Sequence, residues 1–257
     1  MRRMFNVLVD PKTLIVENKQ LLIDVQRRSF MKQTLSLGAL MMLTGCADGY
    51  EPEFADNILD KMSSWNDRAQ AWLFSSNRLA PTYTQADVVD PFRFNAYYGV
   101  DEVRTVDEAT YKLELSGMIA KKDSWTLDKL RALPQESAIT RHICVEGWSM
   151  IGKWGGVPLK TFLEMVGADI TAKYVGFKCT DDYWTSLDMP TALHPQTIMA
   201  LTFNDKVLPK ENGFPFKVRV PTKLGFKNPK HVMEIFVTND YPGGYWEDKG
   251  YNWFSGS

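Results

Sequence analysis

The chain has 257 residues, of which 44% are hydrophobic and 24% are charged. This composition suits a globular protein, and the length fits one large domain or two small ones. Seven of the 30 Lys and Arg residues and three of the 31 Asp and Glu residues lie in residues 1–45, so residues 46–257 carry a net charge of −5. An acidic body without a basic patch argues against nucleic acid as a partner.

The first 45 residues have the pattern of an export signal. Residues 26–32 contain a twin arginine, and the uncharged, mostly apolar run 33–45 follows it. This run is too short to span a bilayer but has the length of a signal-peptide hydrophobic region. Residues 43–46 are similar to a lipobox, in which the cysteine is lipidated. We therefore expect a Tat-type lipoprotein signal peptide over 1–45 and a periplasmic protein anchored through Cys46.

Two details qualify that expectation. Ala47 after the cysteine favours the outer membrane over the inner one. The alternative to a signal peptide is a buried N-terminal helix that contains a chance arginine pair.

Residues 46–75 are expected to form a tether and an amphipathic helix. The tether, 47–56, is polar and contains Gly and Pro. An amphipathic helix is predicted over about 57–74, because six apolar residues recur there at helical spacing: Ile58, Met62, Trp65, Ala69, Trp72 and Leu73. We expect this apolar face to pack against the body of the protein, and docking onto a membrane partner is the alternative.

Residues 76–257 are expected to form one mixed α+β domain. Alternating or apolar runs predict strands at 111–117, 138–144, 173–179, 199–203, 216–220 and 231–237. Short helices are predicted at 126–130, capped by Thr126, and at 158–166, ending near Gly167. A glycine-rich turn is expected at 154–157. Strands outnumber helices, and the order is not that of a regular βαβ array.

Cys144 stands where a predicted strand ends, and Glu146, Gly147 and Trp148 follow it. By residue type alone this cysteine is a nucleophile, a metal ligand or a buried core thiol. The three cysteines predict no disulfide framework, although a bridge between Cys144 and Cys179 is an alternative. No histidine has a partner at i+3 or i+4, so a histidine-rich zinc site is not expected.

Several blocks resemble, in type and in order, the molybdopterin-binding domain of the sulfite oxidase family. They lie at 144–150, 156–159, 173–175, 193–199, 208–213 and 223–230. The branch they resemble most is that of the bacterial periplasmic methionine-sulfoxide reductases. The resemblance covers 93–240 and implies a mixed β-sheet, barrel-like fold with short helices. It also implies molybdenum and molybdopterin as cofactors.

The resemblance assigns a role to particular residues. Cys144 matches the cysteine whose thiolate ligates molybdenum, a soft ligand that must be deprotonated to bind. Glu146 would be catalytic, steering protons, or would only accept a hydrogen bond. Positions for the cofactor would be Asn95, Tyr97, Tyr98, Cys144, Cys179, His194, Asn212, Lys217, Asn228, Pro229 and Lys230.

Most of these residues also have a purely structural explanation. The aromatic loop at 93–99 and the residues Cys179 and His194 would simply pack in the core. Asn212 with Gly213 would be a turn. The cations Lys223, Lys227 and Lys230 favour phosphate binding, and the alternative for them is a solvated basic loop.

Two departures from the family pattern bear on the chemistry. Lys217 stands where the family has an arginine that recognises the pterin. Lysine offers a point charge in place of the planar guanidinium group of arginine. Arg219 lies two residues on, on the same face of an extended strand. Sulfite-oxidising members carry arginines just after the metal cysteine, where this chain has Glu146 and Trp148. A carboxylate there disfavours an anion, so a neutral sulfoxide is the expected substrate.

The resemblance also implies partners. There is no C-x-x-C-H haem motif, so electrons are expected from a membrane haem protein. The stretch after Asn239 is too short for the dimerisation domain of the sulfite oxidases, so a monomer is expected. One rival hypothesis is oxidation of sulfite or another small molecule by the same cofactor. The other is a lipoprotein that binds or transfers electrons without catalysis.

Overall fold

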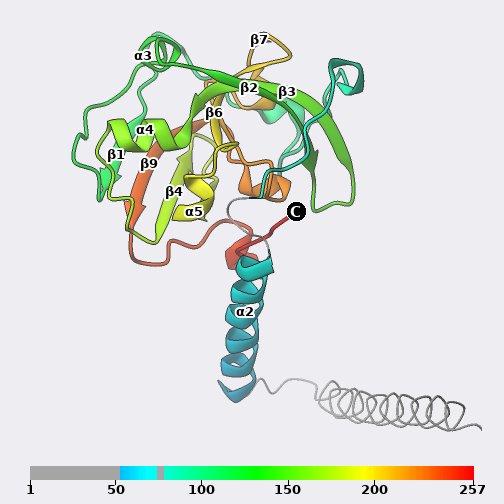
Figure 1. Cartoon of the computed structure of the whole chain (residues 1–257), viewed down its shortest axis with the longest axis vertical. Coiled ribbons are helices and arrows are strands. Elements are labelled where there is room, and N and C mark those ends of the chain that lie inside the picture. The colour runs from blue at the N-terminus through cyan, green and yellow to red at the C-terminus, as the bar shows by residue number, and fades with distance from the viewer. Residues whose placement is uncertain (1–52, 74–77) are drawn as a thin grey trace, which may run out of the picture. The chain divides into compact units, whose positions relative to one another are not determined.

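The computed structural model describes residues 53–73 and 78–257 (Figure 1). Helix α2 (Glu53–Leu73) confirms the helix predicted over about 57–74. It begins earlier than expected, so the prediction of a tether is wrong for residues 53–56. The predicted signal peptide, Cys46 and the tether up to residue 52 lie outside the described residues, as do the predicted boundaries at 45 and 75. Among the described helices, none combines the length and the apolar character needed to cross a bilayer.

One sheet has four strands in the order β1-β9-β4-β5. They are β1 (Glu114–Gly117), β9 (Val232–Thr238), β4 (Tyr174–Cys179) and β5 (Trp184–Asp188). Strand β1 runs parallel to β9, and the other neighbours are antiparallel. Alternate residues such as Val175 and Phe177 are fully buried, which shows that one face of this sheet lies on the core.

The second sheet has five antiparallel strands. They are β2 (Glu136–Ile143), β3 (Ser149–Pro158), β6 (Ile198–Phe203), β7 (Lys206–Val207) and β8 (Lys217–Arg219). The chain turns between β2 and β3 through residues 144–148, and this turn holds Cys144. Strand β8 pairs with β6, so Lys217 lies in the same sheet as that hairpin.

Short helices connect the strands. The α-helices are α3 (Leu127–Arg131), α4 (Leu159–Met165) and α5 (Met189–Ala192). The 3-10 helices are η1 (Gln85–Asp87), η2 (Val100–Glu102), η3 (Lys210–Asn212), η4 (Gly225–Lys227) and η5 (Glu247–Lys249). The Thr126 hydroxyl accepts a hydrogen bond from Lys129 N, as expected of the predicted cap.

The prediction of a glycine-rich turn at 154–157 is wrong, because these residues form the second half of β3. The cause lies in the neighbouring strand. A Cβ on Gly156 would fall 1.9 Å from the carbonyl oxygen of Met199 on β6. Glycine is therefore needed here for close approach of two strands, at the register shift between Gly155 and Gly156.

The main core joins the two sheets and helix α4. Phe177 and Ile235 come from the first sheet, Val157 and Met199 from the second, and Phe162 from α4, and all five belong to one buried cluster. The predicted α+β class with short helices is confirmed. Both sheets remain open within the described ranges, so the barrel-like feature is not present. From Asp60 to Ser257 the chain forms one compact unit.

Candidate active site

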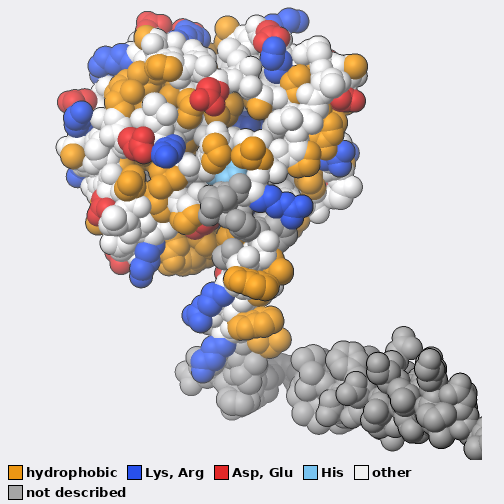
Figure 2. Space-filling view, in the orientation of Figure 1, with side chains coloured by type: hydrophobic (Ala, Val, Ile, Leu, Met, Phe, Trp, Pro, Cys, Tyr) orange, Lys and Arg blue, Asp and Glu red, His pale blue; other side chains and the backbone are white. Residues whose placement is uncertain are grey.

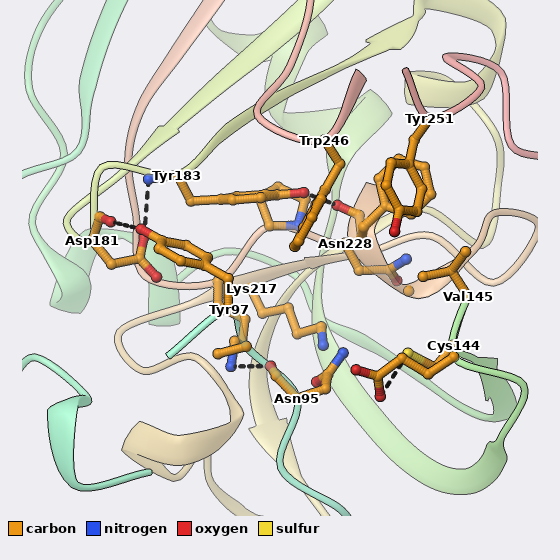
Figure 3. A pocket seen from close by; sticks show the side chains of 16 residues that line it. Asn95, Tyr97, Cys144, Val145, Asp181, Tyr183, Lys217, Asn228, Trp246 and Tyr251 are labelled. Atoms are coloured by element: carbon orange, nitrogen blue, oxygen red, sulfur yellow. Dashed lines mark hydrogen bonds between the residues drawn. The ribbon is translucent and has the colours of Figure 1, made fainter. Parts of the chain in front are cut away.

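A pocket in this unit collects side chains from six separate stretches of the chain (Figure 3). Its lining residues are 95–97, 144–146, 181, 183, 217, 225, 226, 228–230, 246 and 251. They come from the loop before β1, the β2–β3 turn, the β4–β5 loop, strand β8, the segment between β8 and β9, and the C-terminal segment. The fold therefore brings together residues that are far apart in sequence.

The β2–β3 turn presents Cys144 to this pocket. Cys144 N donates to Trp148 O at 2.9 Å, and Gly147 N donates to Cys144 O at 3.1 Å. Gly147 has a φ of +85°, a conformation that glycine adopts without strain. The tight turn keeps Cys144 at the end of the strand with only 7% of its surface exposed. Cys144 and Cys179 are both free thiols, so the alternative of a bridge between them is wrong.

Glu146 lies beside the Cys144 thiol. Its Oε2 is 3.8 Å from Cys144 Sγ and accepts a hydrogen bond from Trp148 Nε1 at 2.8 Å. Burial raises the pKa of the Cys144 thiol, and the negative charge of Glu146 acts in the same direction. The thiol therefore keeps its proton until a cation binds and stabilises the thiolate.

Two lysines supply positive charge to the pocket. Lys217 is only 2% exposed, and its Nζ lies 5.1 Å from the centre of the Trp154 ring. Lys230 Nζ donates to the carbonyl oxygens of Asn95, at 2.7 Å, and Glu211, at 3.3 Å. Neither lysine forms an ion pair with a carboxylate of the described residues. Burial holds the pKa of Lys217 well below its ordinary value and lowers that of Lys230 to about 8.

A bound anion would compensate these two cations. A buried cation without a counter-charge is costly, and a phosphate group supplies that counter-charge. The positions predicted for the cofactor at Lys217 and Lys230 are therefore brought together in one pocket with Cys144. Figure 3 shows Lys217 and Cys144 in this pocket.

Two asparagines have different tasks at this pocket. Asn95 lines it, and its side-chain amide makes no hydrogen bond to any part of the chain that the structure describes, so the amide is available to a ligand. Three of the four hydrogen bonds that an asparagine side chain can make are formed by Asn228 within the protein. Its Oδ1 accepts from Arg219 Nη1 and Val220 N, both at 2.8 Å, and its Nδ2 donates to Leu224 O. Asn228 and Pro229 therefore shape the pocket wall, and Arg219 positions Asn228 while Lys217 faces the pocket.

Aromatic rings form the opposite side of the pocket. Figure 3 shows Tyr183, Trp246 and Tyr251 along that side. Tyr97 stacks on Tyr245 with ring centres 4.6 Å apart, and its hydroxyl donates to the carbonyl oxygen of Asp181. Tyr183 donates to Phe226 O at 2.6 Å. These bonds fix the rings, and the wall can stack on a planar ligand.

Four of the predicted cofactor residues do not line the pocket. The Tyr98 hydroxyl donates to Asp181 Oδ2 at 2.7 Å, so Tyr98 supports a lining residue. Cys179 lines another pocket, with Trp184 and Glu234. Asn212 belongs to η3, and Gly213 follows it with a φ of +118°, which is the turn given as its alternative. His194 Nε2 contacts Arg78 O at 3.2 Å and lines a different pocket, so the fold separates His194 from Cys144.

Lys223 and Lys227 do not line the pocket either, and the alternative of a solvated basic loop is wrong for both. Lys227 is 1% exposed and pairs with Glu247 at 2.5 Å. Lys223 is 3% exposed and lies 3.7 Å from Asp188 Oδ1. They are not solvated loop cations. Each lysine is instead paired with a carboxylate inside the protein.

Several lining residues were not identified from the sequence. Asp181, Tyr183, Trp246 and Tyr251 reach the pocket only through long-range packing, and no local pattern marks them. Gly225 had a signal, because it stands in the Gly-Phe-Lys core of the block at 223–230 that resembles the family. A Cβ on Gly225 would lie 2.7 Å from Nε2 of the buried His142, so glycine is required at this point of the wall.

The arrangement fits a metal that arrives within an organic cofactor. Within the ranges 53–73 and 78–257, no group of three or more His, Cys, Asp or Glu residues could by itself coordinate a metal ion. The pocket offers one thiolate ligand, two unpaired cations, an available amide and an aromatic wall. A pterin dithiolene that carries molybdenum and a phosphate needs these groups: a soft ligand for the metal, cations for the phosphate and a polar wall for the pterin.

Comparisons with known proteins agree with this fit. The family model described as "Oxidoreductase molybdopterin binding domain" matches residues 100–246. A putative protein-methionine-sulfoxide reductase subunit, YedZ1, of Azospira oryzae is 59% identical over 231 residues, covering 90% of this chain and 88% of its own. The protein-methionine-sulfoxide reductase catalytic subunit MsrP of Xanthomonas campestris is 30% identical, covering 86% of this chain and 73% of its own.

A solved structure supports the fold. The sulfane dehydrogenase SoxCD of Paracoccus pantotrophus superposes with a TM-score of 0.51 at 19% identity. The match covers 54% of this chain and 40% of the SoxCD chain. At this identity the likeness concerns the architecture of the domain.

Proposed function

The chain belongs to the oxidoreductase molybdopterin-binding domain family, and from this premise we propose that it reduces a sulfoxide such as methionine sulfoxide. As a member of this family it is an enzyme, and its cofactors are molybdenum and molybdopterin. The observation that carries the choice of substrate is Glu146, whose carboxylate lies 3.8 Å from the Cys144 thiol.

Each group in the pocket has a task toward the cofactor. When bound, molybdopterin-held molybdenum supplies the redox chemistry of oxygen-atom transfer. Cys144 would hold the metal through its thiolate, and Lys217 and Lys230 would offset the negative charge of the cofactor. The Asn95 amide would hydrogen-bond the pterin. Tyr97 and Trp246 would exclude water from that side of the site.

Glu146 is placed to manage protons. Reduction of a sulfoxide consumes electrons and protons and yields a thioether and water, so the site needs a group that delivers protons to the departing oxygen. Trp148 Nε1 donates to Glu146 Oε2 at 2.8 Å and keeps this carboxyl beside Cys144. A carboxyl within reach of the reacting atoms is a suitable proton donor.

The charge of the pocket also separates the two candidate substrates. With Lys217 and Lys230 engaged by the cofactor, the carboxylate of Glu146 remains 3.8 Å from the Cys144 thiol. Sulfite is an anion and would be repelled by Glu146, whereas a sulfoxide is neutral. The names of the relatives support the same choice.

The location and the partners form a further part of the proposal. The twin arginine at 27–28 and the lipobox-like residues 43–46 support Tat export to the periplasm and a lipid anchor at Cys46, with Ala47 favouring the outer membrane. The enzyme would act as a monomer. It would take electrons from a haem protein of the membrane, since its sequence holds no C-x-x-C-H motif.

Purified enzyme from a host that has Tat export and makes molybdopterin tests the proposal. We expect near-stoichiometric molybdenum, lost in Cys144→Ser, and faster turnover of methionine sulfoxide than of sulfite with matched redox dyes. Faster sulfite oxidation would favour the rival oxidase. Metal-loaded protein that turns over neither substrate would favour a non-catalytic electron-transfer protein.

A further inference from the structure

Helix α2 exposes a stripe of large apolar side chains. Met62 is 53% exposed, Trp65 70%, Trp72 82% and Leu73 63%. Successive residues turn by about 100° around a helix, so these four fall within an arc of about 100°. Large exposed side chains gathered in one stripe are unusual for a helix that only packs on its own domain.

The stripe faces away from the body of the protein. Asp67 lies on nearly the opposite side of the helix, about half a turn from the middle of the stripe. Its Oδ1 accepts hydrogen bonds from Asn252 Nδ2 at 2.5 Å and from Phe254 N at 3.4 Å. The helix therefore contacts the C-terminal segment through a polar residue. The prediction that its apolar face packs against the body is wrong for these four residues.

The charges of the helix are arranged around the stripe. Lys61 and Arg68 are exposed, and helical spacing puts both within about 40° of the edge of the stripe nearest Trp72. Figure 2 shows hydrophobic side chains along one side of α2, with Lys and Arg side chains beside them. Basic residues that flank an apolar stripe can reach lipid headgroups while the stripe enters the interface.

The residue types and the length of the preceding segment identify the occupant. Tryptophan prefers the boundary between water and hydrocarbon, and the stripe carries two. Residues 47–52 separate Cys46 from α2, and even fully extended they reach only about 20 Å. An anchor at Cys46 would hold the helix at a membrane surface.

We propose that α2 lies on the surface of a lipid bilayer, with Met62, Trp65, Trp72 and Leu73 inserted into the interface. The helix supplies a second contact with the bilayer beside the anchor expected at Cys46. The site pocket would then act at a restricted distance from the membrane, where a membrane-bound electron donor resides. The lipid contact itself does not depend on the proposed reductase activity.

Brominated lipid tests the contact, because it quenches only tryptophans that touch the acyl region. The cofactor-loaded enzyme is mixed with vesicles of phosphatidylcholine, with and without phosphatidylglycerol, in brominated and ordinary form. We expect quenching with both compositions and somewhat more with phosphatidylglycerol, because of Lys61 and Arg68. Trp65→Phe with Trp72→Phe should lose most of the quenching, which assigns it to the stripe.

A second variant retains the two reporter tryptophans and removes apolar surface from the rest of the stripe. In Met62→Ser with Leu73→Ser, lipid-dependent quenching should fall on the order of tenfold, since each lost side chain removes buried apolar surface. Val207→Ser on β7 is the control, because Val207 is also exposed, at 59%, and should leave quenching unchanged. Turnover of a soluble sulfoxide should stay constant in all variants and checks their folding.

Three results would overturn the proposal. The first is equal fluorescence in brominated and ordinary lipid. The second is quenching that appears only when a membrane protein is added, which would make the stripe a protein-binding surface. The third is a dimer in sedimentation velocity that Trp65→Ser with Trp72→Ser abolishes, which would assign the stripe to a second copy. Absence of reductase activity with quenching intact would reject the proposed function alone.

Discussion

Two pairs of lysines from one short stretch of the chain have opposite surroundings. Lys217 and Lys230 border the pocket and form no ion pair with a described carboxylate, whereas Lys223 and Lys227 lie next to Asp188 and Glu247. All four have lowered pKa values because of burial. The difference shows that the partner of a buried cation, rather than its burial, separates a binding role from a structural one.

The largest effect should come from breaking the internal pair. Lys227→Met leaves Glu247 buried without its cation, so we expect the free energy of unfolding to fall by about 3–5 kcal/mol. Thermal or urea denaturation measures this loss. The double variant Lys227→Met with Glu247→Leu should recover most of it, and a single variant as stable as the parent would show that the pair is not structural.

Lys217→Met should act on the cofactor instead. Removing a buried cation that has no carboxylate partner among the described residues should not lower the stability of the cofactor-free protein. Affinity for molybdopterin should fall about 10–100-fold, as is typical when a supporting residue of a metal site is lost. Cofactor content after dialysis is the measurement, and Lys217→Arg, with its planar fork, should retain it. Equal retention in Lys217→Met would remove this residue from the site.

The pKa of Lys230 predicts that cofactor affinity and the stability of the cofactor-free protein change in opposite directions with pH. Burial lowers this pKa to about 8, so in the cofactor-free protein the charge is present below pH 8 and lost above it. Between pH 7 and 9 the affinity for a phosphate-bearing cofactor should fall by up to about tenfold. Over the same range the unfolded chain binds more protons at this residue, so the stability of the cofactor-free protein should rise with pH.

Release of the pterin, followed by its fluorescence, checks the first trend, and urea denaturation checks the second. Lys230→Met should flatten the contribution of this residue to both. A pH profile that is the same in the variant would assign the dependence to other groups.

The smallest effect is expected at Lys223. Its contact with Asp188 is 3.7 Å long, and that carboxylate also accepts a hydrogen bond from the Thr191 hydroxyl at 2.6 Å. Lys223→Met should therefore change the free energy of unfolding by at most about 1 kcal/mol, with cofactor content unchanged. A loss of cofactor in this variant would mean that the division between the two lysine pairs is incorrect.

The sequence alone determined the features that depend on local pattern. Helical spacing identified α2, and alternation identified most strands that contribute to the core, because burial on one face imposes a period that is visible in sequence. The blocks around Cys144 identified the family and the thiol that faces the pocket. Each block is a run of neighbouring residues, and the blocks follow one another between 144 and 230 in the family's order, so both signals are visible in the sequence.

Only the tertiary structure decided which partner each side chain meets. It paired Lys227 with Glu247, kept Lys217 facing the pocket, placed His194 in another pocket and added Trp246 to the aromatic wall. It also turned the apolar stripe of α2 outward. Such choices depend on residues separated by long stretches of chain, and no local period records which segments will meet. Residue types in the sequence therefore predicted a cofactor site with a thiolate and cations. Long-range contacts determined which individual residues of each type line that site.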